Sequence, residues 1–293
     1  MDWRVMWALA MGMEPETPYV PPYVASLVFF FINMVIGVGL RSMARLFLPG
    51  TARELALDFL CTMEACAYFF ENNFVLKHYG SFWLAVAIIA QLYVCCRTFG
   101  DNIDNPVKAF HGWLTGQVPL AQAGLKIVVT SLAGLASYRL ARLIWSLDLI
   151  EEHHERYHEL ECASDLQVAL LTGLVVEASA SLSDMWLGLQ TVSSMSALDE
   201  LVKYLNAALM IVFGIQTTGM YFNPAMASGH TLGCGTTRFW EHFAVYWVGP
   251  FVGCYLATML DRLLHVDVSK PHAPPPSTDK KADDSKKKKT KAD

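Results

Sequence analysis

Thr217-Thr218-Gly219-Met220-Tyr221-Phe222-Asn223-Pro224-Ala225-Met226-Ala227 is a polar interruption in an otherwise apolar region of the chain. Asn223 is a favourable helix N-cap, and proline at the first helical position gives up an N–H group that would have no partner anyway. The stretch therefore predicts a short helix that begins at Pro224. A second pair, Asn105-Pro106, lies 118 residues earlier and also follows an apolar segment. The chain thus contains the same helix-start motif twice.

An acidic residue recurs with each Asn-Pro pair. Asp58 and Glu177 both lie inside apolar segments, and they are 119 residues apart. This nearly constant offset indicates two homologous halves of three membrane spans each, which in channels and transporters are commonly inverted relative to each other. Carboxyl groups inside apolar spans are costly unless they have partners. These two acids are therefore candidates for a role inside the fold.

The composition favours a polytopic membrane protein over a soluble one. The chain has 293 residues, of which 54% are hydrophobic and only 17% are charged. Apolar runs long enough to cross about 30 Å of hydrocarbon give seven candidate spans, at residues 23–47, 55–74, 82–97, 124–147, 167–187, 201–218 and 242–264. The first span precedes the repeat and is additional to it.

Basic residues orient these spans. Arg41, Arg45 and Arg53 follow the first span, and the positive-inside rule places them in the cytosol. On this topology the loop with Asn105 and the C-terminal tail are cytosolic, whereas the loop at 148–166 and the loop with Asn223 face the lumen or the exterior. The two short helices would then enter the membrane from opposite faces.

Two short helices that begin with Asn-Pro resemble the paired Asn-Pro-Ala boxes of the aquaporin, or major intrinsic protein, family. The resemblance covers about residues 52–265, and residues 242–253 are similar to the family's sixth helix. It implies an all-α membrane protein with an aquaporin-like fold: two inverted three-helix repeats, two re-entrant half-helices and one extra N-terminal transmembrane helix. The expected division is an N-terminal segment at 1–22, the extra helix at 23–51, the channel domain at 52–266 and a Lys- and Pro-rich cytosolic tail at 267–293.

The resemblance implies a passive channel for water and small neutral solutes such as glycerol or hydrogen peroxide. We expect no enzymatic activity, cofactor, metal or nucleic-acid partner, and a homotetramer surrounded by membrane lipid. The pore would lie between the boxes Asn105-Pro106-Val107 and Asn223-Pro224-Ala225, where the helix dipoles oppose protons and cations. Asp58 and Glu177 correspond to buried glutamates that accept hydrogen bonds from the pore loops; a proton relay is the alternative role.

The sequence departs from ordinary family members where selectivity is set. Val107 replaces alanine in the first box, and Met226 stands where water-selective members have the filter arginine. The other filter positions fall on Ala85, Ile211 and Met220. An apolar constriction offers water few polar partners, so we do not expect strict water selectivity. A non-conducting membrane scaffold with the same fold is the alternative that Val107 and Met226 favour.

A divergent first box, an ordinary second box and Cys234, nine residues after Ala225, resemble the unorthodox intracellular super-aquaporins. The resemblance implies an intracellular membrane, and Lys289 and Lys291 look like a dilysine retrieval signal for the endoplasmic reticulum; the plasma membrane is the alternative. Cys234 and Cys162 would both be lumenal. In an oxidising compartment they could form a disulfide, or they could remain two free thiols.

One rival motif is His154-Glu155-x-x-His158, which matches the zinc-protease signature. An intramembrane protease would need it within an apolar span, but it lies in a strongly acidic loop. We interpret it as a solvated lumenal loop, with metal binding or pH sensing by the histidines as alternatives. A seven-helix receptor would fit the number of spans but does not predict the two Asn-Pro pairs.

Overall fold

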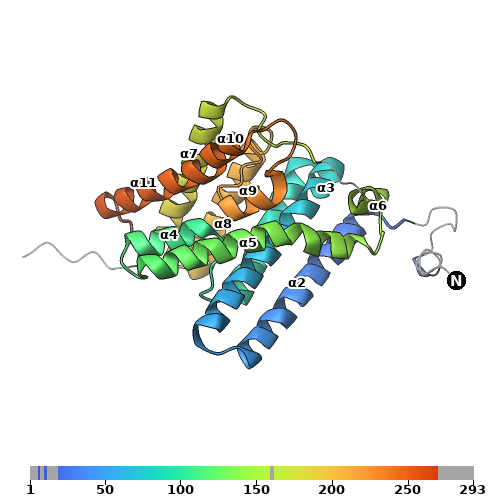
Figure 1. Cartoon of the computed structure of the whole chain (residues 1–293), viewed down its shortest axis with the longest axis horizontal. Helices are drawn as coiled ribbons and strands as arrows, with labels where there is room; N and C mark the ends of the chain where they lie inside the picture. Colours follow the sequence, from blue (N-terminus) through green and yellow to red (C-terminus); the bar gives the residue numbers. More distant parts are fainter. Residues whose placement is uncertain (1–5, 7–9, 12–18, 159–161, 270–293) are drawn as a thin grey trace, which may run out of the picture.

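The computed structural model describes Met6, Ala10, Met11 and residues 19–158 and 162–269 (Figure 1). The tail from residue 270, with its dilysine pattern, lies outside the described residues. The described part is helical, and its one β-type contact is an isolated bridge between Thr191 and Asp267. In chain order the elements are α2 (Pro22–Phe47), α3 (Gly50–Thr98), α4 (Pro106–Leu114), α5 (Leu120–Trp145), α6 (Glu151–His158), α7 (Leu170–Leu189), α8 (Ser196–Gly214), α9 (Pro224–Thr231), α10 (Phe239–Phe243), the π-helical η1 (Ala244–Val248) and α11 (Gly249–Leu263).

The element α3 contains two antiparallel helices separated by Gly80. It has 49 residues, more than twice the about 20 residues that span a bilayer. Gly80 has φ 76° and ψ −176°, a conformation that glycine alone adopts readily. Asn72 and Gln91 exchange two side-chain hydrogen bonds of 2.9 and 2.7 Å, whereas a straight helix would separate them by about 28 Å. The chain therefore reverses at Gly80 and gives the second and third predicted spans.

The two halves of the chain pack in matching ways. In the first half α3 packs on α5, and in the second half α7 packs on α11. The short helix α4 lies against α5 and α11, and the short helix α9 lies against α5 and α3 (Figure 1). A Cβ atom on Gly134 of α5 would lie only 2.0 Å from the carbonyl oxygen of Ala225 in α9. A small residue is thus required where the long helix meets the half-helix.

The last span contains a π-type turn next to a proline. The π segment η1 ends immediately before Gly249 and Pro250. Pro250 has no N–H group to donate to the carbonyl of Tyr246, and a π turn is a common local response to a broken helical ladder. Tyr246 itself is fully buried, and its hydroxyl donates to the carbonyl oxygen of Thr218 at 2.8 Å. The turn therefore coincides with a contact to the loop that precedes α9.

Four described helical segments are long and apolar enough to cross a membrane: α2, α3, α5 and the continuous segment Phe239–Leu263. The segment α3 provides two crossings because of Gly80. The helices α7 and α8 have 20 and 19 residues but are less apolar, and α8 carries three charged residues near its start, Asp199, Glu200 and Lys203. Each of the seven predicted spans nevertheless corresponds to a helical segment.

The helix bundle has two ends. The end at which α11 finishes, at Leu263, is called the tail end. The opposite end contains the disulfide bond between Cys162 and Cys234 and is called the disulfide end.

The additional helix α2 is attached to the bundle by a buried ion pair. Arg41 and Glu64 are both fully buried and bonded to each other. The positive-inside rule used Arg41, Arg45 and Arg53 together as markers of the cytosolic side. In the structure only Arg45 and Arg53 are exposed. Arg41 is thus a packing residue, and this correction leaves two exposed arginines as orientation markers. Its burial depends on Glu64 in the next helix, which a count of positive charges does not consider.

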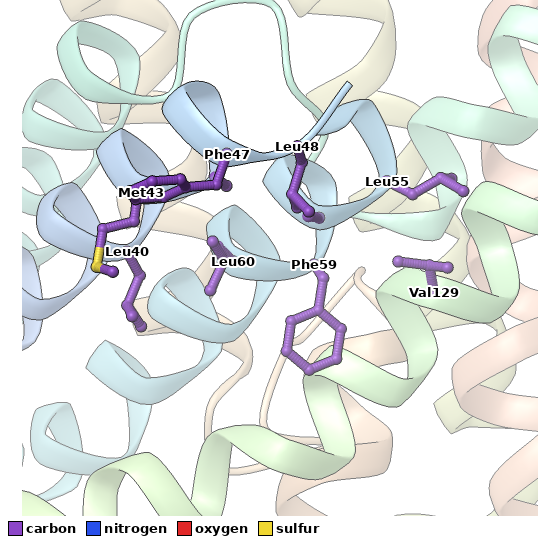
Figure 2. A pocket seen from close by; sticks show the side chains of 10 residues that line it. Leu40, Met43, Phe47, Leu48, Leu55, Phe59, Leu60 and Val129 are labelled. Carbon is purple, nitrogen blue, oxygen red and sulfur yellow. The ribbon is translucent and has the colours of Figure 1, made fainter. Parts of the chain in front are cut away.

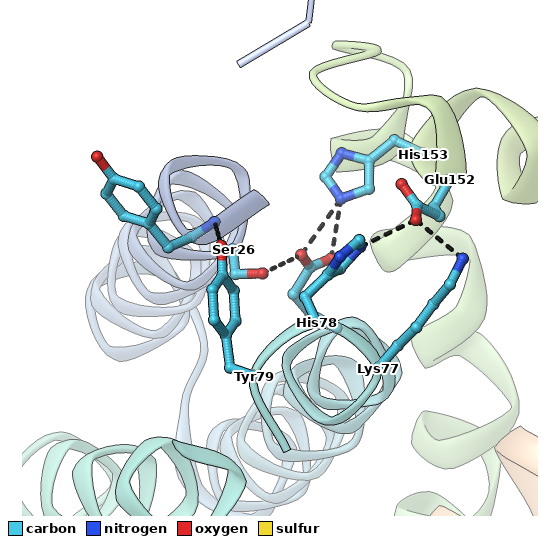
Figure 3. A network of polar contacts seen from close by, with 8 residues as sticks. Ser26, Lys77, His78, Tyr79, Glu152 and His153 are labelled. Atoms are coloured by element: carbon cyan, nitrogen blue, oxygen red, sulfur yellow. Dashed lines mark hydrogen bonds and ion pairs between the residues drawn. The ribbon is translucent and has the colours of Figure 1, made fainter. Parts of the chain in front are cut away.

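A second polar network joins α2 to α3 and α6 (Figure 3) and, through Trp145, to α5. Glu71 of α3 is fully buried and accepts hydrogen bonds from the Ser26 hydroxyl at 2.7 Å and from Trp145 Nε1 at 3.0 Å. His153 Nε2, from α6, lies 3.1 and 3.2 Å from the two oxygens of the same carboxylate. The acidic loop predicted as fully solvated therefore contains a short helix whose His153 is buried.

The neighbouring Glu152, whose side chain is only 16% exposed, also holds α6 against α3 (Figure 3). Its carboxylate accepts from Lys77 Nζ at 2.9 Å and lies 2.9 Å from His78 Nε2. Partial burial raises the pKa of Glu152. The hydrogen bond and charge of Lys77 lower that pKa by more, so that it lies below the ordinary value. The helix α6 is thus bound to α3 by two contacts. His153 makes a buried contact with Glu71, and Glu152 makes an ionic contact with Lys77.

We expect Arg41→Met to destabilise the protein by about 3 kcal/mol or more, because Glu64 would be left as a buried, uncompensated charge. The double variant Arg41→Met/Glu64→Met should recover most of this loss, since it replaces the pair with apolar groups. The measurement is thermal unfolding of the purified protein in one detergent. Arg45→Met, which changes an exposed arginine one turn further along α2, is the matched control. An unfolding temperature of Arg41→Met equal to that of Arg45→Met would contradict the assignment.

Candidate functional site

The two Asn-Pro boxes are linked by a reciprocal pair of hydrogen bonds. Asn105 Nδ2 donates to the carbonyl oxygen of Phe222 at 3.2 Å, and Asn223 Nδ2 donates to the carbonyl oxygen of Asp104 at 3.1 Å. Each asparagine thus binds the residue that precedes the other. An amide NH₂ group has two hydrogens, so one N–H of each asparagine remains for another acceptor.

Each asparagine also caps its own short helix. Asn105 Oδ1 accepts from the backbone N–H of Val107 at 2.9 Å, and Asn223 Oδ1 accepts from Ala225 at 3.1 Å and from Met226 at 3.4 Å. These three bonds satisfy helix N-terminal donors that have no partner within the helix. The amide orientation is therefore determined at both ends, by the cap on the oxygen side and by the opposite loop on the nitrogen side.

The two buried acids support the loops that carry the boxes, but in unequal ways. Glu177 accepts from the backbone N–H groups of Tyr221 at 3.1 Å and Phe222 at 2.6 Å, and from the Thr218 hydroxyl at 2.6 Å. Asp58 accepts from one backbone N–H, that of Ile103, at 2.9 Å. Its second oxygen is bonded to the ammonium of Lys126 in α5.

The shorter side chain explains this difference. Aspartate has one methylene fewer than glutamate, and it reaches only one of the loop donors that glutamate reaches in the other half. The lysine then satisfies the remaining oxygen, so the first loop is supported by one backbone donor and an ion pair, whereas the second is supported by two backbone donors and the Thr218 hydroxyl. Both carboxyl groups are fully buried. Their contacts are those of structural support for the loops.

A cavity of about 150 Å³ lies beside the two asparagines. Its wall includes Asn105, Asn223 and three of the four residues predicted for the filter: Ile211, Met220 and Met226. Ala85, the fourth, instead packs against an apolar cluster and is not among the lining residues; Ile88, nearly one turn further along α3, takes its place on the wall. Three of the four predicted filter residues thus line one cavity, whereas their role as a filter stays a prediction.

The same cavity has polar groups that the sequence analysis did not identify. The mutually bonded amides of Asn72 and Gln91 belong to its wall, as do Asp104, Lys108 and Asp184. The only signal for Asp104 and Lys108 was their charge near a predicted pore loop, and charged residues near membrane loops are common; Asp184 is an acid inside the predicted span 167–187. Their convergence depends on helices that are far apart in the sequence.

A larger recess of about 560 Å³ lies elsewhere, between α2, α3 and α5 (Figure 2). All of its lining residues are apolar: Leu40, Met43, Ala44, Phe47, Leu48, Leu55, Ala56, Phe59, Leu60 and Val129. A water molecule needs two to four polar partners to occupy a buried site, and this lining provides no polar side chain. The recess is therefore a poor site for a polar solute, despite its size.

At the disulfide end, Cys162 and Cys234 are bonded to each other. The backbone follows the bond, because Gly235 donates its N–H to the carbonyl oxygen of Cys162 at 3.0 Å. Nearby, the Asp165 carboxylate accepts a hydrogen bond from the Tyr221 hydroxyl. Burial raises the pKa of Asp165, although the Tyr221 bond and the Arg156 charge oppose the increase. These contacts attach the segment before α7 to both ends of the second box.

The metalloprotease pattern does not form a metal centre in the described residues. His154 and His158 lie on one side of α6 with ring centroids 4.7 Å apart, and His154 Nδ1 lies 3.3 Å from the Asp148 carboxylate. Within the described ranges no group of three or more His, Cys, Asp or Glu residues has an arrangement that could hold a metal ion. The motif therefore has no third ligand there.

The chain has relatives of known family. Residues 19–260 match the family model described as Major intrinsic protein. Aquaporin-11 of Milnesium tardigradum is 25% identical over 213 residues, which cover 73% of this chain and 77% of that protein. Aquaporin-12 of Mus musculus is 26% identical over 249 residues, with coverages of 80% and 84%. Aquaporin-11 of Homo sapiens is 24% identical over 216 residues, with coverages of 71% and 78%.

Among solved structures, an aquaglyceroporin from Plasmodium falciparum aligns with 79% of this chain and 95% of its own chain, at a TM-score of 0.49 and 13% identity. The family model itself spans most of the chain and includes both short helices and both supporting acids. This chain belongs to the major intrinsic protein family, and within it resembles aquaporin-11 and aquaporin-12.

Proposed function

We propose that the protein conducts water and small neutral solutes through the cavity beside Asn105 and Asn223. Membership of the major intrinsic protein family makes it a multi-pass membrane channel for water or small solutes; the proposal concerns the residues and the solutes. The observation that supports it is the reciprocal bonding of the two asparagines, which leaves one N–H of each for a solute in a cavity of about 150 Å³. A water or hydroxyl oxygen can accept from such donors.

The wall of this cavity favours a broader selectivity than water alone. Ile88, Ile211, Met220 and Met226 give this wall an apolar part, and the amides of Asn72 and Gln91 add donors and acceptors to it. Solutes with both hydroxyl groups and carbon atoms, such as glycerol, match a wall of this kind. Hydrogen peroxide matches it as a small neutral donor and acceptor.

The proposed setting is an intracellular membrane, in a homotetramer with one pathway per subunit. Similarity to aquaporin-11 and aquaporin-12 supports membership of the super-aquaporin branch. The disulfide between Cys162 and Cys234 supports an oxidising compartment at that end of the bundle, because disulfides persist in lumenal or extracellular environments. The endoplasmic reticulum fits both features.

The main test is osmotic shrinkage of proteoliposomes measured by stopped-flow light scattering, with sucrose and glycerol steps. We expect the wild-type protein to shrink vesicles faster than lipid alone and to pass glycerol. Asn223→Asp should abolish this, since it replaces the amide donor with a carboxylate that faces the carbonyl of Asp104. Asn102→Asp, which makes the same change in the loop that carries the first box but outside the cavity wall, is the control. Wild-type rates equal to those of empty vesicles would favour a non-conducting scaffold.

A second prediction concerns loop support. Glu177→Gln places an NH₂ group where the carboxylate now accepts from backbone N–H groups, so at least one buried donor loses its acceptor, at a cost of about 1–3 kcal/mol. We expect a lower unfolding temperature and slower osmotic shrinkage. Glu54→Gln, at an exposed position of α3, should change neither quantity. Unchanged shrinkage for Glu177→Gln would argue against a role of this acid in holding the loop.

A third prediction concerns the disulfide. Native membranes treated with a bulky maleimide under denaturing conditions, before and after reduction, should show two more reactive thiols after reduction. A Cys162→Ser/Cys234→Ser variant should show no such increase, which assigns the bond. An equal thiol count before and after reduction of the wild-type protein would rule out the bond in the cell and, with it, this argument for an oxidising compartment.

A further inference from the structure

Lys108 and Met226 hold equivalent positions in the two halves of the chain. Each lies three residues after the asparagine of its box, on the first turn of α4 or α9. Both belong to the wall of the cavity beside the asparagines. The position that carries no charge in the second half therefore carries a lysine in the first half.

The two positions lie toward opposite ends of the bundle. The helix α4 runs from Asn105 toward the tail end, where His111 Nδ1 lies 3.0 Å from the Thr258 hydroxyl near the end of α11. The helix α9 runs from Asn223 toward the disulfide end, where the Thr231 hydroxyl accepts from the backbone N–H of Asp165 at 3.1 Å. Lys108 thus lies on the tail side of the asparagine pair.

Two acids accompany this lysine. Lys108 Nζ lies 2.6 Å from Asp104 Oδ1, and Asp184 of α7 interacts electrostatically with Lys108 from across the cavity wall. Among the described residues that line the cavity, Asp104, Lys108 and Asp184 are the ones of the Asp, Glu, Lys, Arg and His types. The cation is therefore paired with Asp104 in the loop before α4 and lies within electrostatic range of Asp184 in α7, one acid from each half of the chain.

We propose that Lys108, paired with Asp104 and close to the charge of Asp184, is the basic element of this pathway and prevents ions from crossing. The proposal rests on the proposed channel, since it assigns the ion barrier of that same cavity. Two carboxylates without the lysine would attract cations and protons to this end of the cavity, since nothing would then compensate their charge. With the lysine beside them, a neutral solute meets donors and acceptors but less uncompensated charge. The barrier is thereby located on the tail side of Asn105 instead of at Met226.

The experiment measures proton flux into proteoliposomes that contain a trapped pH dye, driven by a potassium diffusion potential, in parallel with osmotic shrinkage. Lys108→Met should raise proton flux about tenfold or more over the wild-type protein. Lys108→Met/Asp184→Asn should return most of the way to the wild-type rate, because it removes one of the two exposed carboxylates. Lys203→Met removes a similar i,i+4 ion pair with Asp199 outside the cavity wall, and should behave as the wild-type protein.

The outcomes separate this proposal from the proposed channel. If the wild-type protein conducts water and Lys108→Met has the proton flux of Lys203→Met, the ion barrier is elsewhere and the proposal is wrong while the channel stands. If the wild-type protein does not conduct water but Lys108→Met leaks protons, the barrier is supported and water conduction is overturned. If neither protein conducts anything, both are overturned.

Discussion

The packing of the two half-helices depends on one constraint, a reciprocal pair of hydrogen bonds. Asn105 donates to the carbonyl group before Asn223, and Asn223 donates to the carbonyl group before Asn105. Each asparagine caps its own half-helix and donates to the other loop, at 3.2 and 3.1 Å. The bonds join the two halves of the chain where non-helical backbone lies at membrane depth, which is tolerated only if its polar groups are satisfied. Glu177, Asp58 and Gly134 support this contact, because they hold the loops and let α5 approach α9 closely.

The two halves satisfy the same constraint with different chemistry. The second half uses a glutamate, three donors and an apolar residue after the box, whereas the first half uses an aspartate, one backbone donor and two lysines. Lys126 completes the support of the first loop, and Lys108 brings charge to the cavity. The first half is therefore where this chain differs most from its own internal copy. The additional helix α2 is bound to this half, through Glu64 and Glu71.

Local sequence features predicted the elements well, because they act over a few residues. The two short helices, their asparagine caps and the seven helical segments follow from Asn-Pro pairs and apolar runs, and the family is confirmed. Contacts between distant segments were not predictable in this way. Arg41 looked like a charge at a membrane surface but is buried against Glu64, and Ile88 instead of Ala85 faces the cavity, because helix rotation depends on packing partners.

The most direct test of the central claim is an experimental structure of the protein in lipid, at a resolution that shows individual water molecules. The account predicts ordered solvent in the cavity, with a water oxygen within hydrogen-bond distance of Nδ2 of both Asn105 and Asn223 while these atoms keep their bonds to the opposite loops. A dry cavity, with the two amides turned away from it or separated by packed side chains, would contradict the claim that this pair is what a permeating solute meets.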